Sequence, residues 1–179
     1  MKKGQIWVSA ALYIALGIIV ITVVLSAGLP LINKIQAKNT LLQTKKVMYQ
    51  LDETARGVML QGAGSKIKTF VEIKKGELTI DPITDNKKRI IWTSLSKYNP
   101  GIEEGATITE GDLEIKNIKK GSEYEVSIIL DLTGFLGDAG LRYDGEETKK
   151  TIMGSYNLVI EHVRKIESEG GQYLNIREV

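Results

Sequence analysis

The sequence predicts an α+β protein, in which a long N-terminal helix packs on an antiparallel β head that is sandwich-like or a wrapped sheet. Three observations predict it. A run from Ile6 to Ile32 has no ionisable side chain except the Tyr13 phenol. Apolar residues from Leu31 to Leu60 then recur at helical spacing. After Ser65 the apolar period changes from about 3.6 to about 2 residues, which is the period of a β-strand.

Length and charge limit the function classes. The chain has 179 residues, so one compact domain follows the apolar run. Its first 60 residues carry seven basic and two acidic groups, and the remainder carries 17 basic and 20 acidic groups. A head with this balance lacks the clustered basic face of nucleic-acid-binding proteins, so no nucleic acid is expected as a partner. The absence of cysteine excludes disulfides and thiolate metal sites.

The apolar run is a predicted membrane-spanning helix. About 20 helical residues, rising 1.5 Å each, cross a hydrocarbon core of about 30 Å. Lys2 and Lys3 before the run predict a cytoplasmic N-terminus and a head outside the inner (cytoplasmic) membrane. A cleaved secretory signal ending at Ala27 is the alternative, but the run exceeds the usual 7 to 15 residues and Leu25 occupies a position that favours a small residue.

The helical pattern continues beyond the membrane run. We expect one helix of about 55 residues from Gln5 to Gln61. Pro30, with Gly28 beside it, predicts a bend or a locally unwound joint. The glycines after Gln61 end the helix. A coiled-coil stalk is the alternative for the second half, whose heptad is irregular. The apolar positions of this half are Leu31, Ile32, Ile35, Leu42, Met48, Leu51, Ala55, Val58 and Met59.

Alternating segments predict the strands of the head. Lys66 to Ile80 is expected to form a hairpin that turns at Lys75 and Gly76. The segment 148–164 is expected to form one strand or two. Further strands are expected at 89–93, 106–109, 112–118, 124–132 and 173–179. Glycine turns between short strands are typical of an antiparallel sandwich or a wrapped sheet.

Two features of the head could suggest a metal site or a catalytic site, and each has a simpler structural explanation. His162 is the only histidine, which excludes a multi-histidine metal site and a self-contained serine triad. It shares a strand face with Leu158 and Ile160, so we expect a structural or interface role. The segment 136–147 could hold calcium through carboxylates, but its spacing does not match the calcium-loop pattern, and a solvated acidic loop is favoured. Its acidic residues are Asp138, Asp144, Glu146 and Glu147.

Two lysine-containing motifs in the head receive structural interpretations. The basic cluster Lys87, Lys88 and Arg89 is interpreted as protection of an edge strand. The sequence Ile-Lys-Lys-Gly occurs at 73–76 and at 118–121, and two similar hairpins explain it better than an internal repeat. No phosphate-binding glycine loop and no nucleophile motif occur in the sequence. We therefore expect no catalytic residues, no metal site, no cofactor and no enzymatic activity.

The sequence Lys2-Lys3-Gly4-Gln5 stands directly before the apolar helix. These residues resemble the class III signal peptide of archaeal type IV pilin-like proteins. This resemblance implies cleavage between Gly4 and Gln5 by a prepilin peptidase. It also implies assembly of the trimmed apolar helices into a homopolymeric filament. Trp7 and Ser9 stand where this family usually has serine and glutamate, so the resemblance is to a divergent member.

These observations predict four segments: a leader over 1–4, an apolar transmembrane or filament-core helix over 5–30, an amphipathic helix over 31–61 and a β-rich head over 65–179. The expected function is a structural subunit of a pilus-like cell-surface filament, whose partners are copies of itself, the peptidase and, before assembly, the membrane. The alternative is a single-pass membrane-tethered extracytoplasmic binding or sensor domain. An anchored enzyme is the least favoured. The residues expected in the filament core are Ile6, Trp7, Ser9, Ala10, Ala11, Leu12, Ala15, Leu16 and Gly17.

Overall fold

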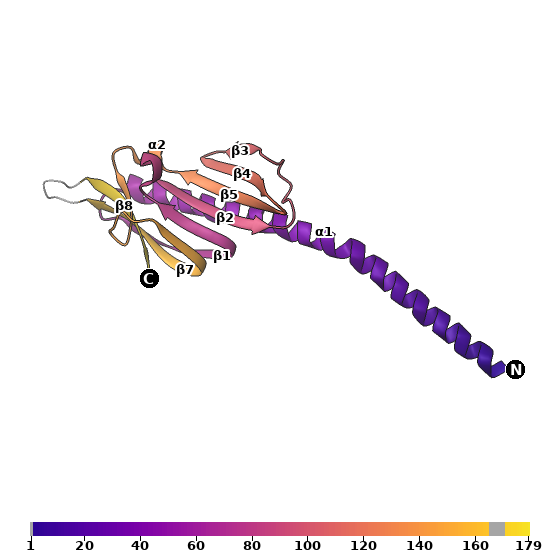
Figure 1. The fold of residues 1–179 in the computed structure, drawn as a ribbon. Coiled ribbons are helices and arrows are strands. Elements are labelled where there is room, and N and C mark those ends of the chain that lie inside the picture. Colours follow the sequence, from indigo (N-terminus) through magenta and orange to yellow (C-terminus); the bar gives the residue numbers. More distant parts are fainter. Residues whose placement is uncertain (1, 165–170) are drawn as a thin grey trace.

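The structure, a computed structural model, describes residues 2–164 and 171–179, and only the backbone of residues 2–6. It confirms the α+β prediction: one long helix packs on a curled, mostly antiparallel sheet of eight strands (Figure 1). The helices are α1 (Lys2–Gln61) and α2 (Thr133–Leu136), with a 3₁₀ turn η1 (Thr84–Asn86). The strands are β1 (Lys66–Asp81), β2 (Arg89–Ser96), β3 (Thr107–Glu110), β4 (Leu113–Lys120), β5 (Glu123–Asp131), β6 (Gly140–Tyr143), β7 (Lys150–Arg164) and β8 (Gln172–Glu178).

Helix α1 is continuous across the predicted joint. Pro30 lies inside it and Gly28 is helical, so the backbone is not unwound there. Pro30 has no N–H for the carbonyl of Ser26, and the turns on both sides keep the helix intact despite this loss. The helix axis changes direction between the part that projects from the head and the part that packs against it (Figure 1).

The docked half of α1 buries one narrow face. Its buried residues follow each other at alternating steps of three and four, which keeps them on one side of the helix. They are Leu41, Thr44, Met48, Leu51, Ala55 and Val58. Four of the predicted apolar positions lie elsewhere on the helix surface and are exposed, namely Leu31, Ile32, Ile35 and Leu42. The apolar positions read from the sequence therefore belong to two different faces of the helix, and only one of these faces packs against the sheet.

The sheet curls around this docked half. The strand order is β3-β4-β5-β2-β1-β7-β8-β6, and every pairing is antiparallel except the parallel pair β6–β8. Strands β1, β5 and β7 contact α1. One core joins the buried helix face to the inward side chains of the strands, with Trp92 among its largest members.

The predicted hairpin over Lys66–Ile80 is wrong in its pairing. The segment forms the single strand β1, and both of its halves pair with β7, with a register irregularity between Ile73 and Leu78. Figure 1 shows β1 and β7 bending together at the end of the head from which the helix emerges, and this bend is called the β1 corner below. The strand is continuous through Lys75 and Gly76, so no hairpin turn interrupts it, and β7 is the partner of both halves.

Glycine is required at this corner. Gly76 has φ of 84°, and a Cβ atom there would lie 2.3 Å from the Thr93 carbonyl oxygen. Gly154, on the paired strand β7, also has a positive φ, of 99°. The second Ile-Lys-Lys-Gly sequence ends at the β4–β5 turn, where Gly121 has φ of 63°. Of the two hairpins predicted from this motif, only the second is a simple hairpin.

The interpretation of the basic cluster at 87–89 as edge protection is wrong. Arg89 begins β2, which lies between β5 and β1 inside the sheet. Its guanidinium lies 3.6 Å from the buried carboxylate of Asp81. Lys87 lies 3.6 Å from the Asp131 carboxylate. The cluster therefore neutralises acidic residues on the two neighbouring strands.

The predicted loop over 136–147 contains a strand. Strand β6 occupies Gly140–Tyr143 and pairs in parallel with β8, with Leu141 buried. Four residues with one core side chain have too little periodicity to be recognised from sequence. Only the parallel pairing with β8, about thirty residues later, shows that this segment is a strand.

Candidate functional site

The projecting half of α1 is the most unusual surface of the molecule. All the residues described from 7 to 27 are exposed, including Trp7, whose exposed fraction is 78 %. By length and composition the helix is able to cross a membrane, and none of its most apolar window is buried against the head. Such a surface in water is unfavourable by about 1.5 to 3 kcal/mol for each large apolar side chain.

Two hydroxyl groups on this half bond to the helix itself. Thr22 Oγ1 donates to the Ile18 carbonyl at 2.8 Å, and Ser26 Oγ donates to the Thr22 carbonyl at 2.6 Å. Bonds of this i to i−4 type satisfy a hydroxyl without water. Both residues are thus compatible with an apolar environment, where an unpaired polar group is costly.

The residues predicted for a filament core lie together on this helix. From Trp7 to Gly17 their side chains are all exposed, and no atom lies within 4 Å of the position where Gly17 would carry a Cβ. The side chain of Ile6 lies outside the described residues. Small residues allow close approach of a second helix, and this part of α1 meets no other element.

The predicted processing site belongs to the first turns of α1. The backbone of Gly4 and Gln5 is helical, in a helix that begins at Lys2. Their side-chain surroundings lie outside what the structure describes. The helix here is far from the head (Figure 1), so the head does not cover the bond between these two residues.

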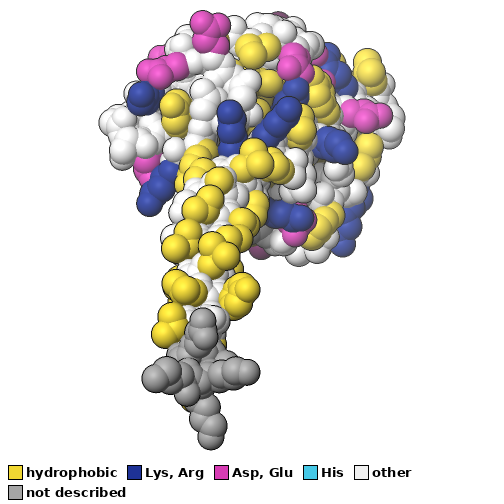
Figure 2. All heavy atoms as spheres, turned by 90° about the vertical axis from the view of Figure 1, so that its right-hand side faces the viewer, with side chains coloured by type: hydrophobic (Ala, Val, Ile, Leu, Met, Phe, Trp, Pro, Cys, Tyr) yellow, Lys and Arg dark blue, Asp and Glu magenta, His cyan; other side chains and the backbone are white. Residues whose placement is uncertain are grey.

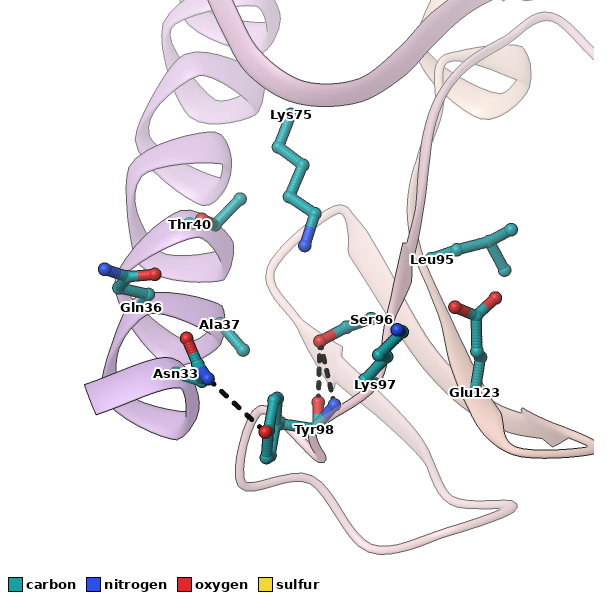
Figure 3. A pocket seen from close by; sticks show the side chains of 10 residues that line it. All are labelled: Asn33, Gln36, Ala37, Thr40, Lys75, Leu95, Ser96, Lys97, Tyr98 and Glu123. Atoms are coloured by element: carbon teal, nitrogen blue, oxygen red, sulfur yellow. Dashed lines mark hydrogen bonds between the residues drawn. The ribbon is translucent and has the colours of Figure 1, made fainter. Parts of the chain in front are cut away.

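A groove of about 610 Å³ lies where α1 enters the head (Figure 3). Asn33, Ala37 and Thr40 of α1 form one wall, and the end of β2 forms the other. The side chain of Lys75 points into the groove from the β1 corner. The remaining lining residues are Gln36, Leu95, Ser96, Lys97, Tyr98 and Glu123.

Hydrogen bonds hold the outer rim of the groove. Asn33 Nδ2 donates to the Tyr98 hydroxyl at 3.3 Å, which ties the helix to the loop after β2. Ser96 Oγ donates to the Tyr98 carbonyl at 2.8 Å and accepts from the Tyr98 N–H at 3.2 Å. None of these rim residues, Asn33, Ser96 and Tyr98, was predicted from the sequence to lie at a site. Only the lysine-glycine corner at Lys75 carried a signal, and it was interpreted as a turn.

His162 has a structural environment. It is buried, and its Nε2 lies 3.2 Å from Gln172 Oε1 on the paired strand β8. Its backbone N–H donates to the Ser65 carbonyl, and its own carbonyl accepts from Gly64. The histidine therefore joins the turn after α1 to β7, which is a structural role of the kind expected from its position beside Leu158 and Ile160.

Local hydrogen bonds and one ion pair order the segment 136–147. Arg142 pairs with Glu147 at 2.8 Å, and the Gly145 N–H donates to Asn175 Oδ1. Across the described ranges, 2–164 and 171–179, no three acidic or histidine side chains lie close enough to hold a metal ion. All four acidic residues are exposed, as a solvated acidic segment requires, although strand β6 lies inside the segment.

Comparison with known proteins adds no relative: no protein-family model, no curated protein and no solved structure matches the chain.

Proposed function

We propose that the chain is a structural subunit of a pilus-like surface filament, held together by its apolar N-terminal helix. One observation carries the proposal: the head folds on the second half of α1 alone, and the first half remains as an exposed apolar rod. A rod of this kind needs a non-aqueous partner. Lipid can be that partner before assembly, and copies of the same helix can replace lipid afterwards.

The chemistry of the rod suits both environments. The Thr22 and Ser26 hydroxyls are bonded to carbonyls of the same helix, so transfer from lipid to a helix bundle leaves neither of them unpaired. Its small residues, such as Ala10, Ala11 and Gly17, permit close packing of helices where water exclusion is not the driving force.

The docked half of α1 offers a continuation of the same interface. Ile35 and Leu42 lie seven residues apart on the face of α1 opposite its buried row, and both are exposed. Tyr49, seven residues further, is 40 % exposed, but its hydroxyl donates to the Glu110 carbonyl of β3 at 3.2 Å. Residues seven apart lie on one side of a helix. A filament in which α1 forms the centre and the heads lie outside would cover this row together with the apolar half.

The resemblance of Lys2-Lys3-Gly4-Gln5 to a class III signal peptide supports removal of the first four residues before assembly. We expect an inner-membrane precursor with a cytoplasmic N-terminus and its head outside, from which a prepilin peptidase produces the mature chain. Gln5 is then the first residue of the filament subunit.

Mass spectrometry of the native N-terminus tests this proposal. We expect a mature chain that begins at Gln5, and we expect the Gly4→Leu variant to keep its leader. The Gly17→Ala variant, with open space at its Cβ, is the matched control and should still be cut. A native chain that begins at Met1 or Lys2 argues instead for a permanently membrane-tethered binding or sensor domain.

Electron microscopy of sheared surface material provides the second test. Filaments that contain this chain are expected, and they should be missing in cells that carry only the Gly4→Leu form. If the native chain stays in the membrane fraction and no filament contains it, the filament proposal is wrong.

A further inference from the structure

We propose that the base of the head is an electrostatic docking surface for the anionic phospholipid headgroups of the membrane that α1 spans. The surface is a basic collar, defined here as Lys34 and Lys38 on α1 together with Lys75 and Lys97 in the groove. Figure 2 looks at the head from the N-terminal side and shows lysine and arginine side chains around the helix where it enters. The inference rests on the membrane stage of the proposed function but not on filament assembly.

The collar lies at the right depth. The apolar run ends at Ile32, and the groove begins one residue later, at Asn33. Ala37, on the groove wall, is five residues beyond Ile32, or about 7.5 Å along a helix. The headgroup layer on each side of a bilayer is about 5 to 8 Å thick. The groove is therefore level with the lipid phosphates when the hydrocarbon ends at Ile32.

The apolar run is longer than the hydrocarbon core requires, and this excess length should bring the collar closer to the membrane surface. Its 27 residues from Ile6 to Ile32 extend about 40 Å, while the hydrocarbon core is about 30 Å thick. A span that is too long tilts in the bilayer. Tilt lowers one side of the head onto the membrane surface, so collar side chains on that side enter the headgroup layer.

The collar lysines are free to bind an external anion. Among the residues that the structure describes, none of the four has a carboxylate within ion-pair distance, whereas Lys45, Lys116, Lys119 and Lys120 all do. Glu123 is the one acidic residue of the groove, opposed by Lys75 and Lys97. With Lys34 and Lys38 the collar keeps a net charge of +3 around the helix.

The shape and rim of the groove suit a headgroup rather than a flat contact. Its 610 Å³ lies within the range of ordinary ligand pockets, and the Asn33 amide, bonded to the Tyr98 hydroxyl, lies at its rim on the same side of α1 as Lys75 (Figure 3). Leu95 and Met153 lie beside the Lys75 corner, with exposed fractions of 50 % and 60 %. Exposed apolar side chains beside lysines are typical of surfaces that insert into a membrane interface.

Amine labelling in lipid nanodiscs tests the proposal on the full, uncut chain. In phosphatidylcholine discs with about 30 % phosphatidylglycerol, Lys75 and Lys97 should be acetylated at least about threefold more slowly than in pure phosphatidylcholine, since each basic residue near an anionic surface strengthens binding about fivefold. Salt at about 1 M, where the Debye length is about 3 Å, should remove the difference. Lys66 and Lys68, at the opposite end of β1, are the internal reference and should label equally in both discs.

A variant pair isolates the collar from general charge. In a Trp7→Phe background, Trp92 is the only tryptophan, and energy transfer from it to a dansyl headgroup lipid reports how close the head lies to the membrane. Anionic lipid should increase the transfer. Lys75→Gln with Lys97→Gln should abolish that increase, whereas Lys66→Gln with Lys68→Gln removes the same charge and should leave it unchanged.

The negative outcomes are distinct. Equal labelling of Lys75 and Lys97 in both discs overturns the proposal, as does an equal effect of the two variant pairs. Protection by inorganic phosphate in phosphatidylcholine discs would identify a site for small anions in place of a membrane surface. A chain that fails to enter discs overturns both the collar and the membrane stage, whereas a chain that docks in discs but is not cut at Gly4 overturns only the filament proposal.

Discussion

The indole N–H of Trp92 donates a hydrogen bond of 2.9 Å to the carbonyl oxygen of Lys75. This bond joins the middle of β2 to the corner of β1, where the sheet folds back. Trp92 is only 2 % exposed, so its N–H has no access to water and the Lys75 carbonyl is its partner. The corner that positions Lys75 in the groove is thus fixed from inside the core.

Replacement of Trp92 by phenylalanine should loosen this corner. The variant leaves the Lys75 carbonyl without its donor and opens space in the core, and we expect the free energy of unfolding to fall by about 2 kcal/mol. Urea unfolding of the full chain in detergent micelles, followed by circular dichroism, measures it. The Tyr98→Phe variant removes a rim hydroxyl and should cost less than about 0.5 kcal/mol; an equal loss in both would contradict the assigned role of Trp92.

Substitution of Gly76 by alanine should be strongly destabilising. Its positive φ and the 2.3 Å approach of Thr93 O to a Cβ atom both oppose a side chain, and a loss of about 3 kcal/mol is expected in the same assay. Gly154→Ala has a positive φ but open space and should cost about 1 kcal/mol. Gly134→Ala has neither constraint and should be neutral; destabilisation there as large as at Gly76 would refute the steric explanation.

Leu51 and Leu42 should separate head stability from assembly. Leu51 is fully buried between α1 and the sheet, so Leu51→Ala should lower the free energy of unfolding by about 3 kcal/mol. Leu42 is 44 % exposed on the opposite face, so Leu42→Ala should leave unfolding nearly unchanged. If the outer face packs against other subunits, Leu42→Ala should instead reduce the yield of filaments. Equal unfolding losses for both variants would contradict the observed orientation of the helix.

Stability should fall in acid through Asp81 and Asp131. Burial alone raises the pKa of each carboxyl, but hydrogen bonds outweigh it: Asp81 accepts from the N–H groups of Thr84 and Ile83, and Asp131 accepts from Thr133, so each pKa lies below its usual value. A folded-state pKa below the unfolded value of 3.8 stabilises the protein above that pH. This stabilisation is lost as the pH falls through the folded-state pKa.

Asp52 acts in the opposite direction. Burial raises its pKa above the usual value despite the nearby Arg56, so its contribution to stability is present below the unfolded pKa and is lost as the pH rises through the folded-state pKa. The net acid response therefore depends on Asp81 and Asp131 outweighing Asp52.

Replacement of Asp81 by asparagine tests the acid response. At pH 7 the variant should be less stable by about 2 kcal/mol, and the gap to the native chain should narrow as the pH falls below the unfolded value of 3.8 toward the lower folded-state pKa of Asp81. Urea unfolding at several pH values measures the gap. Asp85→Asn is the control because its side chain is 75 % exposed and Asn tolerates its φ of 58°. A constant gap at all pH values would show that the charge of Asp81 does not contribute.

Local pattern was sufficient for most elements of the fold. The apolar run, the helical spacing to Leu60 and the glycines after Gln61 predicted one helix to within a few residues of its observed bounds. Period-two alternation located β2, β4 and β5, whose buried residues alternate with more exposed ones. Strands β7 and β8 were also located, although each buries several consecutive residues. The helical and the strand periods both depend on residues close together in the sequence, so they can be recognised before the fold is known.

Pairing and proximity depended on tertiary structure. Lys66–Ile80 has the alternation and the glycine of a hairpin, but β7 bonds to both of its halves, and a remote strand cannot be seen in local spacing. For the same reason the groove could not be predicted, because its walls come from Asn33, Lys75 and Lys97, which are up to 64 residues apart in the sequence.

Composition and apolar period are properties of adjacent residues, so they were enough to predict a long apolar helix, a β-rich head after Ser65 and charged residues on both flanks of the span. Which face of α1 meets the sheet depends instead on how distant segments pack. The tertiary structure also brought Lys75 and Lys97 beside the end of the apolar run, because packing of distant segments around Trp92 selects one arrangement among many with the same local pattern.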